Sequence, residues 1–110
     1  MVYLPSNVQT VDGNMLFSER LKELRIGKQM PQRCLAAALD IDTATYCKIE
    51  KGERKAKKEH LPILSDVLCV DEDDLLTLWL ADRVSDIIAS DEEVAPEVLS
   101  IVSNGLKQSR

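Results

Sequence analysis

The chain has 110 residues, of which 45% are hydrophobic and 30% are charged, and its formal net charge is −5. This length fits one domain with a modest core plus a short extension, and the balance of apolar and charged residues excludes a disordered chain. No apolar run approaches the roughly 18 residues that span a bilayer, and the first residues lack the basic start and apolar centre of a signal peptide. We therefore expect a cytoplasmic protein that has no membrane partner.

An N-terminal arm is predicted over residues 1–13, which show no hydrophobic periodicity. A first helix is predicted from about 15 to 27, because apolar residues then recur at helical spacing while charged residues face away. The apolar positions are Leu16, Phe17, Leu21 and Leu24. Gly27 lies near the end of this helix.

A second helix is predicted after Pro31, since proline is favoured at the start of a helix. The segment QRCLAAALD is short, and its three consecutive alanines permit a neighbouring helix to approach closely. Asp40 follows where the chain must turn, and aspartate tolerates the left-handed backbone conformation better than most residues. The second helix should therefore end in a tight turn at Asp40.

A third helix is predicted from about 43 to 51. Asp42 is a good N-cap for this helix, and Gly52 stops it. By their spacing, Tyr46 and Ile49 should face inward. The segment ERKAKK that follows is polar and basic, so we expect a loop.

Three more helices are predicted in the second half of the chain. HLPILSDVLCV places its apolar residues on one face and Pro62 in the first turn, where proline is tolerated. The acidic run at 71–74 favours the start of a fifth helix from about 72 to 89, because carboxylates are stabilised near the positive end of a helix. After Pro96 a last amphipathic helix follows, and it should end near Gly105 or fray just beyond.

The last two helices carry more apolar surface than a small helical core can cover on one side. We interpret the surplus as a homodimer interface. The predicted interface residues are Leu76, Trp79, Leu80, Val84, Ile87, Ile88, Val98, Ile101 and Val102.

The charges are segregated along the chain. Residues 17–60 hold eleven Lys or Arg against seven Asp or Glu, whereas residues 61–110 hold three against eleven. Since salt screens exposed charges beyond about 10 Å, a basic face can bind phosphate while a distant acidic segment adds only mild repulsion. The acidic net charge therefore does not exclude a nucleic-acid partner.

The chain shows no signature of an enzyme, a metal site or a cofactor. It has no glycine-rich phosphate loop, no Ser-His-Asp set and no metal-ligand spacing. Cys34, Cys47 and Cys69 are expected to be small buried residues rather than redox sensors, and no CxxC pair indicates zinc. His60 is expected at the surface or at a helix start, in preference to an acid-base or metal role.

One set of motif residues ties these elements to a known family. Gln32 opens the second helix, Leu35 and Ala36 lie within it, Ile41 follows the turn, and Ile49-Glu50-Lys51-Gly52 closes the third helix. Residues 17–80 resemble the lambda-repressor and Cro type of helix-turn-helix domain, also called the XRE family. The resemblance implies an all-α fold with a DNA-binding domain of four to five helices over residues 14–80, followed by a C-terminal helical extension over residues 81–110.

The resemblance also implies roles for individual residues. Glu50 matches a buried glutamate that pairs with an arginine late in the first helix, here Arg25, which favours a structural ion pair over a DNA role. The base-reading positions are occupied by Thr43, Ala44, Thr45 and Lys48. Gln32 matches a residue that contacts phosphate or braces a base-reading side chain, and the expected phosphate contacts after the third helix are Lys51, Arg54, Lys55, Lys57 and Lys58.

The sequence departs from the family pattern at four positions. Asp40 replaces the usual turn glycine, Pro31 stands where a serine or asparagine cap is common, and Ala56 occupies the usual proline position. Ala44 gives up a polar base contact, which weakens the expected direct reading of bases.

The expected function is that of a transcriptional regulator, by preference a repressor, that binds a palindromic operator in double-stranded DNA as a homodimer. The alternative is an antitoxin-like or adaptor protein that uses the same fold to bind another protein. The sequence selects neither an operator sequence nor a small-molecule effector.

Overall fold

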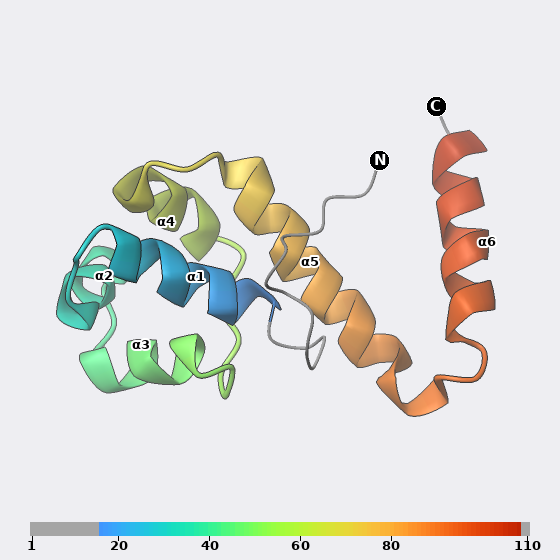
Figure 1. Ribbon diagram of the computed structural model, residues 1–110, viewed down its shortest axis with the longest axis horizontal. Coiled ribbons are helices and arrows are strands. Elements are labelled where there is room, and N and C mark those ends of the chain that lie inside the picture. Colours follow the sequence, from blue (N-terminus) through green and yellow to red (C-terminus); the bar gives the residue numbers. More distant parts are fainter. Residues whose placement is uncertain (1–15, 109–110) are drawn as a thin grey trace.

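The computed structural model describes residues 16–108, so the predicted arm over residues 1–13 lies outside the described residues. Within this range the chain forms six α-helices and one short 3₁₀ helix, without strands (Figure 1). The elements are α1 (Leu16–Gly27), α2 (Gln32–Leu39), α3 (Thr43–Glu50), α4 (His60–Leu68), α5 (Glu72–Ile88), η2 (Ala89–Asp91) and α6 (Ala95–Gln108). The predicted helices are all present, and their bounds differ from the prediction by a few residues at most.

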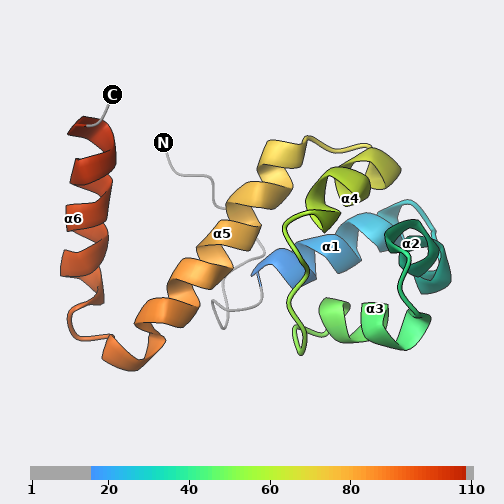
Figure 2. The ribbon, with the colours of Figure 1, turned by 180° about the vertical axis from the view of Figure 1, so that it is seen from behind.

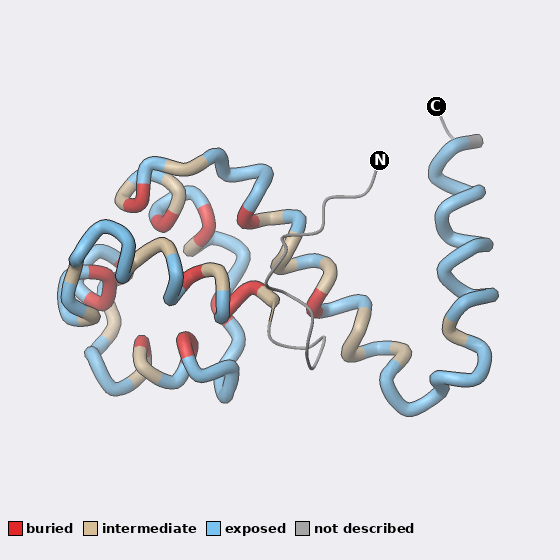
Figure 3. Tube along the Cα trace, viewed as in Figure 1, coloured by how far each residue is buried: buried red, intermediate tan, exposed pale blue. Residues whose placement is uncertain are grey.

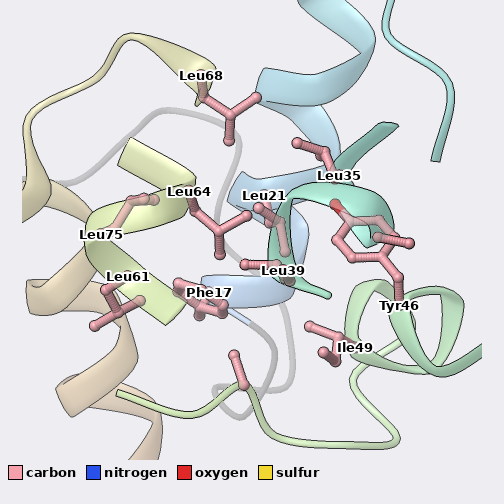
Figure 4. Close-up of a cluster of buried hydrophobic side chains, with 12 residues drawn as sticks. Phe17, Leu21, Leu35, Leu39, Tyr46, Ile49, Leu61, Leu64, Leu68 and Leu75 are labelled. Atoms are coloured by element: carbon pink, nitrogen blue, oxygen red, sulfur yellow. The ribbon is translucent and has the colours of Figure 1, made fainter. Parts of the chain in front are cut away.

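The core lies between α1, α2, α3, α4 and the first half of α5. The apolar positions that recur at helical spacing in each helix turn toward this centre (Figure 4). The buried residues are Phe17, Leu21, Leu35, Ala36, Leu39, Tyr46, Ile49, Ala56, Leu61, Leu64, Leu68 and Leu75. Burying an aliphatic or aromatic side chain of this size contributes about 1.5–3 kcal/mol, so these residues hold the five helices together.

The turn between α2 and α3 follows the prediction. Asp40 adopts the left-handed conformation, with φ 61° and ψ 43°, and its backbone N–H donates to carbonyl groups in the last turn of α2. The Asp42 carboxylate accepts a hydrogen bond of 2.8 Å from the backbone N–H of Thr45, which caps α3. Gly52 follows α3 with a φ of 81°, a conformation that glycine adopts without strain. Local chemistry therefore sets the angle at which α3 leaves α2.

The amino end of α1 is capped by a side chain from α5. The Asp82 carboxylate, on a residue only 8% exposed, accepts hydrogen bonds from the backbone N–H groups of Leu16 at 3.1 Å and Phe17 at 2.9 Å. Burial raises the pKa of Asp82, while the two backbone donors oppose that rise. This contact joins the first helix of the domain to the fifth, and it fixes the middle of α5 against the start of α1.

The last helix stands away from the other helices. A turn separates α6 from α5, and the axes of the two helices point in different directions. The views from both sides show α6 apart from α1–α4 (Figures 1 and 2). Residues from Pro96 to Lys107 are all exposed, whereas the buried residues gather at the other end of the molecule (Figure 3). The helix also continues past Gly105 to Gln108, beyond the end that the glycine predicts.

The cysteine prediction was wrong for two of the three residues. Cys34 is exposed, because Leu35, Ala36 and Leu39 occupy the inner face of α2. Cys69 is also exposed and holds the left-handed position after α4, with a φ of 59°. Cys47 is half-buried.

Candidate nucleic-acid interface

The third helix presents one face to the core and the opposite face to solvent. Tyr46 and Ile49 are 0% and 3% exposed, respectively, and point into the core from α3 (Figure 4). The proposed base-reading residues Thr43, Ala44 and Lys48 lie on the exposed side, while Thr45 is half-buried. A helix held along one side and open along the other has the shape needed to enter a DNA major groove, which is about 12 Å wide.

The carboxyl end of α3 is anchored by an ion pair with α1. Arg25 Nε lies 2.6 Å from Glu50 Oε2, and Arg25 Nη2 lies 3.1 Å from Glu50 Oε1, so the guanidinium group contacts both carboxylate oxygens. The same guanidinium group donates to the Met30 carbonyl through Nη1 at 2.8 Å. Because the Glu50 side chain is only 2% exposed, Arg25 supplies charge compensation that water cannot.

Two more donors complete the hydrogen bonding of the Glu50 carboxylate. The Tyr46 hydroxyl donates to Oε2 at 2.6 Å, and Gln32 Nε2 donates to Oε1 at 3.1 Å. Burial raises the pKa of Glu50, but the hydrogen bonds from Arg25, Tyr46 and Gln32 outweigh it, so the pKa is lowered overall. Glu50 is therefore ionised at neutral pH and belongs to the internal structure of the domain.

Gln32 is directed toward α3 rather than away from the protein. Its Oε1 accepts a hydrogen bond of 2.9 Å from the Cys47 thiol, while its Nε2 contacts Glu50, so both ends of the amide are engaged. The family resemblance offered two roles for Gln32, contacting phosphate or bracing a base-reading side chain, and the two residues that it contacts here are not among the proposed base-reading residues. Glu50, which accepts the hydrogen bond from Gln32, is a buried residue at the end of α3. The sequence offered no signal for the hydrogen bond between Gln32 and Cys47.

A basic loop joins α3 to α4, and we use that name for residues 51–59. Its backbone folds back onto α3, since the N–H groups of Glu53 and Arg54 donate to the Lys48 carbonyl at 2.9 and 3.3 Å. The side chains of Lys51, Arg54, Lys57 and Lys58 are exposed, as phosphate contacts must be. The loop therefore places exposed cations directly after α3.

The middle of the basic loop is held by α5. Lys55, a proposed phosphate contact, forms an ion pair with Asp86. The adjacent residue Ala56 is 4% exposed and its carbonyl accepts a hydrogen bond of 2.8 Å from Trp79 Nε1. The polar composition of ERKAKK gave no indication that one of its residues would be part of the core.

The proposed dimer residues divide into two groups. Leu76 and Trp79 are partly buried and pack against the core of their own chain, which leaves only part of each side chain for a partner, and their place in an interface stays a prediction. Leu80, Val84 and Ile87 on α5, with Val98, Ile101 and Val102 on α6, are 37–75% exposed, and Ile88 is half-buried. The second group stays a prediction for a dimer interface.

Two side-chain contacts of α5 were not foreseen from the sequence. Asp82 caps α1, and the guanidinium group of Arg83 lies 4.8 Å from the centroid of the Trp79 ring.

Among residues 16–108, no group of three or more His, Cys, Asp or Glu side chains is arranged to hold a metal ion. Over the same range, none of the helices has the length and apolar character needed to cross a bilayer.

Comparison with known proteins gives one match. A family model described as helix-turn-helix matches residues 21–75, half of the chain. No curated protein and no solved structure gave a significant match. The matched residues run from α1 into α5 and include the turn between α2 and α3, the α3 helix and the basic loop. The chain therefore belongs to the XRE-type helix-turn-helix family of DNA-binding transcriptional regulators.

Proposed function

We propose that the protein is a cytoplasmic repressor that binds a palindromic operator as a homodimer, with α3 in the major groove of each half-site. The observation that carries this proposal is the exposed face of α3, followed directly by the cations of the basic loop. Occupying an operator is sufficient for repression, because a bound protein excludes others from the same DNA. One such domain covers a small area of DNA, so two half-sites about one helical turn apart give useful affinity.

The side chains on α3 support a modest direct reading of bases. Lys48 can donate to guanine O6 and N7, and Thr43 can donate, accept or contact a thymine methyl group. Ala44 offers only apolar contact. Lys48 is therefore the strongest candidate for sequence reading, while Lys51 and Arg54 fix the register on the phosphate backbone.

A salt titration of DNA binding tests the proposed function. We expect log K to fall linearly with log salt concentration, with a slope steeper than about −3, because each neutralised phosphate contributes about −0.9. The measurement is fluorescence anisotropy or gel shift with genomic DNA fragments of the host at several salt concentrations. If no fragment is retained at low salt, the regulator proposal fails and the protein-binding alternative gains support.

The Lys48→Ala substitution tests the base-reading role. Selecting bound sites from random DNA should return a defined motif for the wild-type protein, and the variant should lose preference at one base pair in each half-site. The expected loss of discrimination between bases at that position is about 1–3 kcal/mol, which is what one well-placed contact between a side chain and a base provides. Lys51→Ala serves as the control, since losing a phosphate contact should weaken binding to all sequences alike. An unchanged motif with Lys48→Ala would remove Lys48 as a base reader.

The exposed apolar residues of α5 and α6 support self-association. Leu80, Val84 and Ile87 form one stripe along α5, with a spacing of four and three residues. Ile101 and Val102 lie on an apolar face of α6 with exposed fractions of 70% and 53%. The alternative of an antitoxin-like or adaptor protein would use the same two surfaces to bind a different chain.

A further inference from the structure

Arg83 is an isolated cation in the acidic half of the chain. Between residues 61 and 108 the only other basic residue is Lys107, near the end of α6. Arg83 is exposed on α5, and its guanidinium group lies over the Trp79 ring. A guanidinium group on an aromatic face keeps its N–H donors free at its edges, so this contact orients Arg83 without consuming its hydrogen bonds.

Trp79 fixes the position of Arg83 relative to the basic loop. The Trp79 indole donates to the Ala56 carbonyl at 2.8 Å, so the ring cannot move without breaking that bond. A single hollow on the protein surface is lined by residues of both elements, among them Arg54 and Lys55 of the basic loop and Trp79 and Arg83 of α5. The structure thus brings three cations from two separate segments to the same hollow.

The nearby carboxylates do not compensate all three cations. Asp82 accepts the two backbone N–H groups at the start of α1, and Asp86 pairs with Lys55. Within residues 16–108, neither Arg54 nor Arg83 has a carboxylate within ion-pair distance. Neither arginine at the hollow is therefore held in an ion pair, although the pKa of Asp42, which is lowered mainly by its hydrogen bond with Thr45, is also lowered by the charge of Arg54. Guanidinium groups bind phosphate oxygens through two parallel N–H donors.

We propose that Arg83, together with Arg54, binds a backbone phosphate of the operator, and that the DNA contact surface extends from α3 and the basic loop onto α5. This inference rests on the proposed DNA binding. The Arg54 backbone N–H donates to the Lys48 carbonyl in the last turn of α3. Ile49 of α3 lines the same hollow as Arg54 and Arg83, so this hollow adjoins the carboxyl end of α3. A contact from α5 positions the domain on the backbone and carries no sequence information of its own.

The test compares Arg83→Gln with Lys107→Gln, which removes the same charge from the other exposed cation between residues 61 and 107. DNA affinity is measured as a function of salt for both full-length variants and the wild-type protein. We expect Arg83→Gln to reduce the magnitude of the slope by about 0.9 per bound protomer, because one phosphate contact is lost. Lys107→Gln should leave the slope unchanged. The selected DNA motif should be the same for all three proteins.

Arg83→Lys and circular dichroism separate charge from packing. If phosphate binding is the role of Arg83, the lysine variant keeps most of the salt slope, since lysine also neutralises a phosphate. A slope for Arg83→Gln equal to that of the wild type, in a protein with an unchanged helical spectrum, overturns the inference while the proposed function stands. Salt-independent or absent binding by the wild-type protein overturns both.

Discussion

Replacing Arg25 by alanine is expected to lower the free energy of unfolding by about 3–5 kcal/mol, the usual cost of leaving a buried charge without its partner. The Glu50 side chain would stay 2% exposed with only the neutral donors Tyr46 and Gln32. The Met30 carbonyl would also lose the donor that supports the turn after α1. Urea denaturation at neutral pH, followed by circular dichroism, measures the change.

Arg20→Ala is the matched control for this prediction. Arg20 lies on the same helix and also forms an ion pair of 2.6 Å, with Glu23, but the two side chains are 39% and 47% exposed. An exposed pair of this kind contributes about 0.2–1 kcal/mol, because water screens it. If Arg25→Ala destabilises the domain no more than Arg20→Ala does, the Arg25–Glu50 pair does not anchor α3.

Local signals explain why the helix bounds could be predicted. Asp40 in the left-handed region, Asp42 as a cap and Gly52 after α3 each act on the backbone within a few residues, so their effect is visible in the sequence. The same holds for Pro31 before α2, which lies in an extended conformation with φ −73°. Turns and helix caps are formed by residues close together in sequence, and the tertiary packing is consistent with these local preferences.

Contacts between distant segments explain what the sequence did not reveal. Asp82 caps α1 from 65 residues away in sequence, and no periodicity predicts such a bond. Ala56 is buried because Trp79 covers the basic loop, although its sequence neighbours are all charged. The exposure of Cys34 likewise depends on which face of α2 meets α3 and α4. In each case tertiary packing overrides the preference of the residue itself.

The candidate site was predictable in its outline and less so in its details. The exposed positions of Thr43, Ala44 and Lys48 follow from the burial of Tyr46 and Ile49, since a helix that buries one face exposes the opposite face. Side-chain pairing is different, because it depends on neighbours that the pattern does not specify.

The second large effect is expected from Ile101→Asp, which places a charge on the apolar face of α6. Ile101 is 70% exposed, so one chain alone should tolerate the change with little loss of stability. In a dimer that buries this face, each copy would bury an unpaired carboxylate, which costs several kcal/mol. We expect the variant to be monomeric at micromolar concentration by light scattering, and its operator affinity to fall by at least about 100-fold, because the two half-sites then bind independently.

Gly105 would permit close packing on this face of α6 in such a dimer. A methyl group added at Gly105 would meet nothing within 4 Å in one chain, yet glycine inside a helix costs about 1 kcal/mol relative to alanine. Gly105 lies one turn after Ile101 on the same face, where a second helix could approach the backbone closely.

Ser100→Asp is the control, because Ser100 is exposed on the polar side of the same helix, opposite the centre of the apolar face, and receives the same charge. This variant should remain dimeric and bind the operator as the wild type does. A dimer that persists in Ile101→Asp would exclude this face of α6 from the interface, and the exposed stripe on α5 would then be the surface that joins two copies. Loss of the dimer only in Ile101→Asp would mean that α6, which is exposed from Pro96 to Lys107, is held in place by a second copy.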